Sequence, residues 1–355
     1  MGHFSGSRRG LLTVGGSDTR VLYDAFGNPN YMVAIPRFNL DTIDPAWPAT
    51  PHPAFLVNGV VKDRIYVGKY QASLLGSRYV SVPGKIPAVD VNFDQALSRC
   101  AEKGPGWHLM TNAEWAAVAL WCWKRNLQPR GNTNWGLSSD NAAEGGIRGD
   151  GLDNGTASGD GKTLTGSGPG TWNHNAKSDG IADLCGNVWE WVGGIRVNAG
   201  EINVLADNNA ADNTKDQAAG SAEWKAILAA DGSLVAPGTA ATCKYDGTAA
   251  NGTGNTQLDD TIDYQSDGNG YSGGGFASMA TDITVPSVLK QLCLYPIAAS
   301  GLGSDYCWVR NQGERLPHRG GDWHDGSHAG VFLLYLYYGR SITYWTFGFR
   351  PAFVI

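Results

Sequence analysis

The sequence predicts an α+β fold that combines two helices with short antiparallel strands, many loops and a long insertion. Glycine accounts for 49 of 355 residues and charged residues for only 17% of the chain, which favours a loop-rich protein over a helical one. Apolar residues recur at helical spacing in two segments. Elsewhere, β-branched and aromatic residues form short runs between Gly and Asn-Gly turns. A chain of this length can bury a sizeable core.

Residues 1–55 are predicted to form a small N-terminal extension, because turns there alternate with short apolar runs such as Tyr31 to Pro36. The main domain is expected to span residues 56–355. It opens with two apolar runs on either side of Asn58-Gly59, a dipeptide typical of two-residue hairpin turns. We therefore expect a β-hairpin at the start of this domain.

The two predicted helices follow this hairpin. In residues 89–104, apolar positions recur every three or four residues, Asn92 or Asp94 can cap the start, and Gly104 can end the helix. The second helix is expected to begin at Thr111, three residues before Glu114, which is the spacing of a capping box.

Two long segments have the composition of loops. Residues 131–170 are rich in Gly, Asn, Asp and Ser, which favour turns. Residues 196–299 shift toward Ala, Asp, Asn, Gly and Thr, and few large apolar residues recur among them. We interpret this second segment as a low-complexity insertion rather than a second core.

The charge distribution argues against two classes of partner. The formal net charge is -6, and no basic run is dense enough to neutralise a phosphate backbone, so nucleic acid is not expected as a partner. No apolar stretch is long enough to span a bilayer, so membrane insertion is not expected either. The first 20 residues lack the apolar core of a signal peptide, which predicts synthesis and folding in a cytoplasm.

The six cysteines show no CxxC spacing, so a structural zinc site is not expected. Cys122 lies between Trp121 and Trp123, and Cys185 follows Leu184. We interpret both cysteines as small buried apolar residues. A disulfide is the alternative.

Three segments together resemble a known family. They are GWHLMTNAEWAAVALW at 106–121, GIADLCGNVWEWV at 180–192 and RGGDWHDGSHAGVFLLYLYYGRSITYWTFGFRPA at 319–352. Their order and wording are similar to the formylglycine-generating-enzyme branch of the C-type lectin fold. The resemblance covers about residues 60–195 and 300–355, and it implies a C-type lectin fold for residues 56–355.

The GNVWEW motif carries a candidate calcium site. In a strand, Trp189 and Trp191 would share one face and Glu190 would point to the other. In several relatives this motif binds calcium through an Asn or Asp, two main-chain carbonyls and the Glu, and oxygen donors suit this hard cation. The matching positions in this sequence are Asp183, Gly186, Val188 and Glu190. The alternative is that the two carboxylates only satisfy nearby backbone donors, and no cofactor is otherwise required.

The chemistry of this enzyme branch is not expected here. Its members oxidise a substrate cysteine with two cysteines of the terminal segment, and residues 320–350 contain none. Without a thiolate, this segment has neither a soft ligand for copper nor a redox nucleophile. One alternative is a copper oxidase of this type with displaced cysteines, for which Cys293 and Cys307 are the candidates. Another is a calcium-dependent carbohydrate-binding lectin, although the EPN and QPD tripeptides of such lectins are missing.

The terminal segment alternates in a way that predicts a strand with two different faces. The even-numbered residues from Phe332 to Leu336 would face the core, whereas Leu333, Tyr335 and Tyr337 would lie on the opposite face. Tyrosine offers a large contact area, few rotatable bonds and a hydroxyl group, so we interpret this second face as a recognition surface. The alternative is that the insertion covers it.

Four polar residues before this strand could instead bind a metal ion: Asp322, His324, Asp325 and His328. The two histidines are four residues apart, as in helical zinc motifs, but the surrounding glycines argue against a helix. No Glu lies between the histidines to act as a general base. We therefore interpret these residues as exposed loop residues.

The same segment resembles the variable region of proteins diversified by retroelements, in which template adenines are randomised, mostly in Asn codons. The frame GGxWxxGSxAGVFxLxLxxxRSxxxxxxGFR is present at residues 320–350. The resemblance implies that frame residues maintain the fold while the side chains between them vary and bind a ligand. The intervening positions are Asp322, His324, Asp325, His328, Leu333, Tyr335, Tyr337, Tyr338, Ile342, Tyr344 and Trp345.

The genetic code provides a check on this resemblance. Changing the two adenines of an AAY codon can produce Tyr, His, Asp, Leu, Phe or Ile, but never Lys, Glu, Gln or Met. These last four residue types are absent from Gly320 to the C-terminus and occur throughout the rest of the chain. Trp345 would need a different template codon, and Leu333 often corresponds to a fixed residue.

The sequence therefore predicts a non-catalytic protein that displays a hypervariable C-terminal surface. The expected partner is a protein or glycan on a target cell surface. Resemblance to phage-encoded members of the family implies a receptor-binding protein of a phage tail, or otherwise a protein displayed on a microbial surface. The sequence implies no particular oligomeric state.

Overall fold

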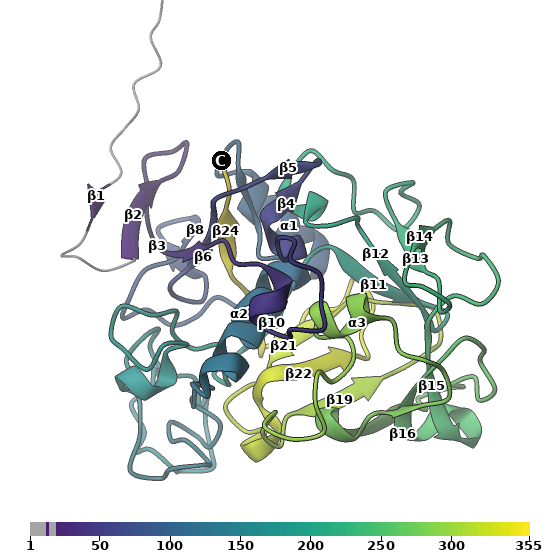
Figure 1. The fold of residues 1–355 in the computed structure, drawn as a ribbon. Helices are drawn as coiled ribbons and strands as arrows, with labels where there is room; N and C mark the ends of the chain where they lie inside the picture. The colour runs from purple at the N-terminus through teal and green to yellow at the C-terminus, as the bar shows by residue number, and fades with distance from the viewer. Residues whose placement is uncertain (1–11, 14–18) are drawn as a thin grey trace, which may run out of the picture.

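The computed structural model describes residues 12–13 and 19–355 (Figure 1). Its helices are α1 (Phe93–Ala101), α2 (Asn112–Arg125) and α3 (Ser287–Gln291), and most of its strands belong to three sheets. The fold is therefore mixed α+β with more sheet than helix, which confirms the α+β part of the predicted fold class. In the part of the chain that the structure describes, no helix has the length and apolar character needed to cross a membrane.

The first sheet joins the N-terminal strands to the last strand of the chain. Its order is β1-β2-β3-β6-β24-β9. The strands are β1 (Leu12–Thr13), β2 (Thr19–Tyr23), β3 (Pro29–Pro36), β6 (Arg64–Gly68), β9 (Trp107–Leu109) and β24 (Pro351–Phe353). Residues 32–35 of β3 are all buried, as in a strand covered on both faces.

The described part of residues 1–55 thus shares a sheet with the C-terminus, through the antiparallel pairing of β3 with β6 and of β6 with β24. The short apolar run from Tyr31 to Pro36 is thus a strand, and its partner β6 is distant in sequence. The predicted absence of a signal peptide concerns a segment that lies mostly outside the described residues.

Two hairpins follow. Strands β4 (Leu56–Val57) and β5 (Val60–Val61) are joined by Asn58 and Gly59, whose φ angles of 50° and 72° match a primed two-residue turn. This confirms the hairpin predicted from the Asn-Gly dipeptide. The second hairpin consists of β7 (Ser73–Leu75) and β8 (Arg78–Val80).

Both predicted helices are present and begin where their capping residues indicate. Asn92 caps α1 in a reciprocal pair with Gln95, and Thr111 caps α2 in the same way with Glu114. In each capping box, the cap side chain accepts a hydrogen bond from an N–H group that the helix itself leaves free. Helix α2 is buried along most of its length because it lies in the main apolar cluster.

The second sheet contains the C-terminal segment. Its order is β17-β19-β22-β21-β10-β23. The strands are β10 (Trp189–Trp191), β17 (Ser272–Gly275), β19 (Tyr306–Val309), β21 (His318–Gly320), β22 (Gly330–Leu336) and β23 (Phe347–Phe349). Strand β22 lies between β19, which runs parallel to it, and β21, which runs antiparallel.

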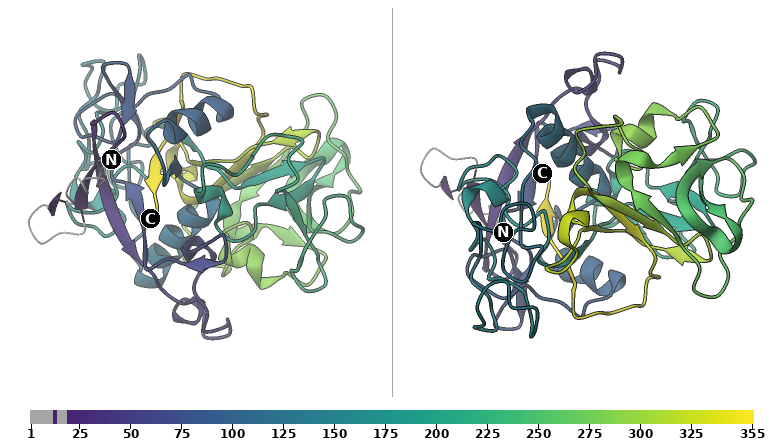
Figure 2. Two further views of the ribbon diagram at one scale, coloured as in Figure 1. Left: turned by 90° about the horizontal axis from the view of Figure 1, so that it is seen from above. Right: turned by 90° about the horizontal axis from the view of Figure 1, so that it is seen from below.

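The third sheet is built mostly from residues 196–299. It contains β11 (Ile195–Asn198), β12 (Glu201–Val204), β13 (Lys225–Ile227), β14 (Leu234–Val235), β15 (Lys244–Ala249), β16 (Thr253–Asp259), β18 (Ala280–Thr281) and β20 (Glu314–Arg315). Figure 2 shows this green part of the chain on the opposite side of the molecule from the N-terminal strands, with the yellow C-terminal strands between them.

The insertion is more ordered than its composition suggested. Ile202, Tyr245, Leu258 and Phe276 are all buried in the main apolar cluster, together with residues of α2 and β22. Large apolar residues are sparse in this segment, but many of them face this cluster, and Leu205 and Trp224 form a small cluster of their own. The insertion therefore extends the main core, and our interpretation of it as low-complexity sequence needs this correction.

Candidate ligand-binding site

The two faces of β22 differ as the alternating pattern predicted. Phe332, Leu334 and Leu336 are buried in the main apolar cluster. On the opposite face, burial decreases along the strand: Leu333 is fully buried, whereas Tyr335 and Tyr337 are partly exposed. The recognition surface predicted for this face is therefore open only toward the C-terminal end of the strand.

The open end of β22 forms one wall of a pocket of about 360 Å³. Its lining is mainly aromatic, with two carboxylates and a histidine at one edge. The lining residues are Trp189, Tyr271, Trp308, Asp322, His324, Asp325, Tyr335, Tyr337, Tyr338, Tyr344, Thr346 and Phe347. Such a mixture of aromatic surface and a few polar groups is typical of a ligand-binding site.

Most of the predicted variable residues meet at this pocket. Those that line it are Asp322, His324, Asp325, Tyr335, Tyr337, Tyr338 and Tyr344. Of the other four, His328, Ile342 and Trp345 are exposed outside the pocket lining. The fold thus brings together side chains that are spread over more than twenty residues of sequence.

Two of the predicted ligand-contacting residues are buried, and for Leu333, which lies outside the pocket lining, the prediction needs correction. Leu333 belongs to a second apolar cluster that includes Phe93 and Ala96 of α1, so it cannot contact a ligand directly. Asp322 reaches the pocket lining, but its side chain is almost fully enclosed and is bonded to Trp189 and His324. Alternation predicted the face of Leu333 but not the apolar cluster that buries it.

The sequence did not identify four aromatic members of the pocket, which are Trp189, Tyr271, Trp308 and Phe347. The ring centroid of Trp189 lies 4.7 Å from that of Tyr335, and Trp308 lies 5.5 Å from Tyr335. Tyr271, from the insertion, meets Tyr337 edge to face at 5.4 Å. The insertion therefore contributes one wall of the pocket and leaves this face partly open. Trp308 is the cross-strand partner of Tyr335, a pairing between β19 and β22 that no local sequence pattern indicated.

A buried polar network lies at the edge of the pocket. The Asp322 carboxylate accepts a hydrogen bond from the indole Nε1 of Trp189 at 3.1 Å. It also pairs with Nδ1 of His324 at 2.8 Å. The Asp325 carboxylate accepts a hydrogen bond from the backbone N–H of Asp322 at 2.7 Å. Hydrogen bonding to Asp322 raises the pKa of His324. Burial, with the nearby Asp322, raises the pKa of Asp325 to about 8.

Asp325 should make the stability of the protein fall as the pH rises. Between the ordinary carboxyl pKa of 3.8 and the folded value of about 8, the folded state holds a proton that the unfolded state has released. Raising the pH through this window therefore favours unfolding. We expect Asp325→Asn to lose less stability than the wild type between about pH 5 and pH 8, as measured by urea unfolding. Parallel pH profiles for the two proteins would contradict this assignment.

The two histidines near this network point to different neighbours. The ring of His324 lies 6.1 Å from Trp135, and the ring of His328 lies 4.5 Å from Tyr306. Only a single 3-10 turn separates them, at Gly326–His328. Among the described residues, no group of three or more His, Cys, Asp or Glu side chains is placed to hold a metal ion.

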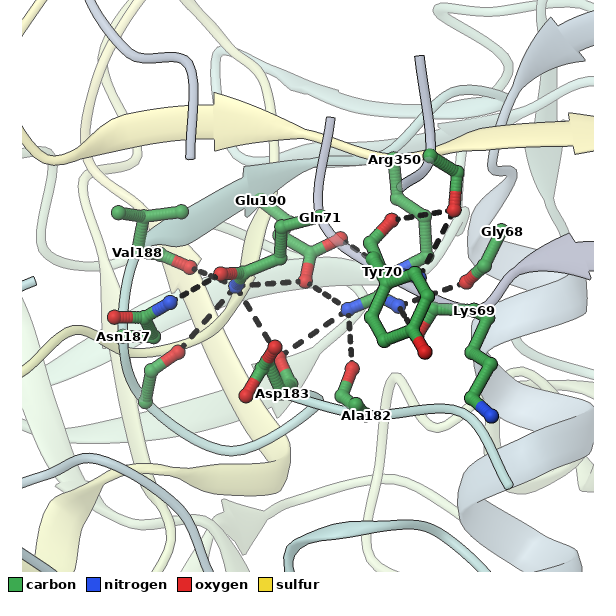
Figure 3. Close-up of polar contacts among 12 residues, drawn as sticks. Gly68, Lys69, Tyr70, Gln71, Ala182, Asp183, Asn187, Val188, Glu190 and Arg350 are labelled. Carbon is green, nitrogen blue, oxygen red and sulfur yellow. Dashed lines mark hydrogen bonds and ion pairs between the residues drawn. The ribbon is translucent and has the colours of Figure 1, made fainter. Parts of the chain in front are cut away.

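The residues predicted to bind calcium surround a side-chain amide instead. Nε2 of Gln71 lies 3.0 Å from the Val188 carbonyl, 3.1 Å from the Glu190 carboxylate and 3.2 Å from the Asp183 carbonyl (Figure 3). It also lies 3.5 Å from the carbonyl oxygen of Gly186. The Asp183 carboxylate is engaged elsewhere, because it accepts a hydrogen bond from the N–H of Gly166.

Arg350 occupies the other side of the same group of oxygens. Its guanidinium group binds both carboxylate oxygens of Glu190, at 2.7 and 2.9 Å, and donates to the carbonyls of Gly68, Lys69, Ala182 and Asp183 (Figure 3). A positive charge and an amide thus satisfy the oxygens that a cation would need. The residues present do not fit a calcium ion, and the sequence pattern did not reveal the role of Gln71.

Calcium should therefore leave the stability of the protein unchanged. Because N–H donors already bind the candidate ligand oxygens, we expect the same midpoint of thermal unfolding in millimolar calcium and in excess EDTA. A reference titration with magnesium would separate a specific effect from ionic strength. A midpoint that rises with calcium concentration alone would show that a calcium site exists.

The cysteines of the enzymatic alternative are unsuited to copper chemistry. Cys293 and Cys307 are free and buried, and burial raises the pKa of each thiol to about 12. Both side chains therefore stay protonated, whereas copper binding and redox chemistry need a thiolate. Cys122 and Cys185 are also free and buried, which confirms our interpretation of them as small apolar residues.

Comparison with known proteins gives distant structural similarities. No protein-family model matches the chain, and no curated protein matches it. The chain is similar to Treponema denticola variable protein 1, with a TM-score of 0.33 and 15% identity, over 96% of this chain and 99% of that chain. It is also similar to the P3c and U1 variants of Major Tropism Determinant, each with a TM-score of 0.32 and 11% identity, over 96% of this chain and 73% of that chain.

Proposed function

We propose that this protein is a non-catalytic receptor-binding protein of the C-type lectin fold, in the formylglycine-generating-enzyme branch, and that a retroelement diversifies its segment 320–350. The observation that carries this proposal is the aromatic pocket, because most of the side chains predicted to vary line it. These residues were selected only by their positions in the sequence frame. Their meeting in one pocket therefore supports a shared role in binding a ligand.

The burial of the frame supports the same division. Trp323, Phe332, Leu334 and Phe349 are all frame residues, and each is fully buried. Variation at such positions would cost stability, whereas variation at partly exposed positions between them costs little. A surface built in this way can change its ligand while the fold is retained.

The pocket favours a partner with a projecting group over a flat one. Tyrosine rings offer apolar contact together with hydroxyl groups, and burial raises the pKa of the phenols of Tyr335 and Tyr338, so both remain protonated donors. The exposed side chains of Ile342 and Trp345 extend the contact area beyond the pocket. The proposed partner is a protein or glycan on a target cell, with the protein carried on a phage tail or a microbial surface.

The genetic part of the proposal is tested in the flanking DNA. We expect a near-copy of codons 320–350 that differs only where the copy has adenine, close to a reverse-transcriptase gene. A copy whose differences fall equally on the frame codons, such as those of Trp323 and Phe332, would contradict diversification by a retroelement.

The binding part is tested with intact cells of a panel of candidate host strains. We expect the purified protein to bind one or more of them, and Tyr337→Ala and Tyr344→Ala to weaken that binding at least tenfold. Tyr23→Ala is the matched control, since Tyr23 is as exposed as Tyr344 but lies in β2, outside the pocket. Equal losses in all three variants, or none, would argue against the pocket as the binding site.

The two alternatives give different outcomes. A carbohydrate-binding lectin predicts binding that is abolished by EDTA and restored by calcium. A copper oxidase predicts stoichiometric copper binding that is lost in Cys293→Ser or Cys307→Ser. Either outcome would replace the present proposal.

A further inference from the structure

Two arginines flank the open end of β22. Arg310 follows β19, and its backbone N–H donates to the carbonyl of Leu336 at 3.0 Å. Arg315 lies in β20, where the backbone N–H of the next residue donates to the carbonyl of Tyr338, also at 3.0 Å. The two backbone segments thus lie beside β22 and its continuation, with Tyr337 between these two contacts.

Neither arginine has an acidic partner among the described residues. Both are only partly exposed, and the Nε atom of each is buried without a hydrogen-bond partner within the described part of the chain. The guanidinium of Arg310 lies 5.7 Å from the ring centroid of Tyr337 and donates one hydrogen bond to Gln312, which is neutral. Partly buried guanidinium groups are usually paired with a carboxylate.

The nearest acid in sequence is already engaged. Glu314 is adjacent to Arg315, but its carboxylate binds Arg196 at 3.1 Å and Arg340 at 3.0 Å. Glu314 therefore cannot also neutralise the charges of Arg310 and Arg315. Burial and the nearby charge of Arg310 lower the pKa of Arg315, which means that the protein environment disfavours its positive charge. An incoming anion would relieve this electrostatic cost.

We propose that Arg310 and Arg315 form an oxyanion-binding subsite at the edge of the aromatic pocket, beside Tyr337. The subsite receives a carboxylate, sulfate or phosphate group of the ligand, because a guanidinium group matches two oxygens of such a group in one plane. The inference rests on the proposed function for the identity of the ligand, and it specifies the chemistry of one part of that ligand.

The location of the subsite has a functional consequence. Both arginines lie outside residues 320–350, so the subsite would be retained while the residues around the pocket change. Variants with different pocket residues would then share a requirement for an anionic group on their targets. The fixed charge would orient each ligand, and the variable side chains would select among ligands.

The subsite is tested by titrating the protein with acetate, sulfate and inorganic phosphate at constant ionic strength. The Nε–H resonances of Arg310 and Arg315 are followed by NMR, because these groups are the buried donors without partners. We expect saturable shifts at both resonances with at least one anion. Acetate alone would identify a carboxylate subsite, and sulfate or phosphate alone a subsite for a tetrahedral anion.

The variants are Arg310→Gln and Arg315→Gln. Each should weaken anion binding at least tenfold, as read from the Nε–H resonance of the arginine that remains. Arg64→Gln is the matched control, since Arg64 is exposed in β6, outside the pocket. Unchanged midpoints of thermal unfolding would establish that the variants are folded. If one variant does not fold, the other still tests anion binding.

No saturable shift, or equal shifts at Arg64 and the paired arginines, would overturn the subsite. The titration uses no cell-surface ligand, so this failure would leave the result of cell binding by the Tyr337 variant unaffected. Conversely, a failure of cell binding would not change the anion titration.

Discussion

Replacing Arg350 with alanine should lower the free energy of unfolding by about 3–5 kcal/mol, the usual cost of breaking a buried ion pair. The Arg350 guanidinium is fully buried and bonded to Glu190 and four main-chain carbonyls. Its removal leaves the Glu190 carboxylate in the interior, where the Gln71 amide still donates one hydrogen bond to it. Equilibrium urea unfolding, followed by far-UV circular dichroism, measures the loss.

The double variant Arg350→Met with Glu190→Leu provides the control for this explanation. Removing both charges leaves no unpaired carboxylate, so we expect the double variant to be more stable than Arg350→Ala. Arg64→Ala, at an exposed position, should change the stability by less than about 0.5 kcal/mol. A loss below about 1 kcal/mol for Arg350→Ala would show that the central polar network does not stabilise the fold as argued.

A pair of neighbouring tryptophans should separate the frame from the variable surface. Trp323 is a fully buried frame residue, whereas Trp345 is a variable residue that is 39% exposed, and their ring centroids lie 4.9 Å apart. Trp323→Ala leaves a cavity in the packed interior and should cost about 3–5 kcal/mol. Trp345→Ala removes a side chain at the protein surface, leaves no enclosed cavity and should cost less than about 1 kcal/mol.

Urea unfolding of the two variants and the wild type measures both values under one set of conditions. The comparison is matched for residue type and for position, since the two side chains contact each other. Trp323→Phe should fall between the two values, because it retains much of the buried ring. Equal losses for Trp323→Ala and Trp345→Ala would contradict the division between a supporting frame and a replaceable surface.

Local patterns in the sequence predicted local structure well. The capping boxes at Asn92 and Thr111 and the Asn58-Gly59 turn were recognisable because their partners lie within a few residues along the chain. The alternation in β22 predicted its buried face for the same reason, since neighbouring side chains of a strand must point in opposite directions.

Contacts between distant segments were not predictable in this way. Gln71 and Glu190 are 119 residues apart, and no local pattern indicates that an amide fills the place expected for calcium. The burial of Leu333 depends on the cluster that it shares with α1. The sparse apolar residues of the insertion pack into the main core because the third sheet places them there.

The sequence by itself determined the α+β class, the helices and hairpin, and the set of residues between 320 and 350 among which a binding surface should be sought. The tertiary structure alone decided which of them share a pocket, that Tyr271 and Trp308 complete it, and that Arg310 and Arg315 lie beside it. The physical reason is range: turns, caps and alternation depend on neighbours along the chain, whereas a pocket depends on how three sheets pack.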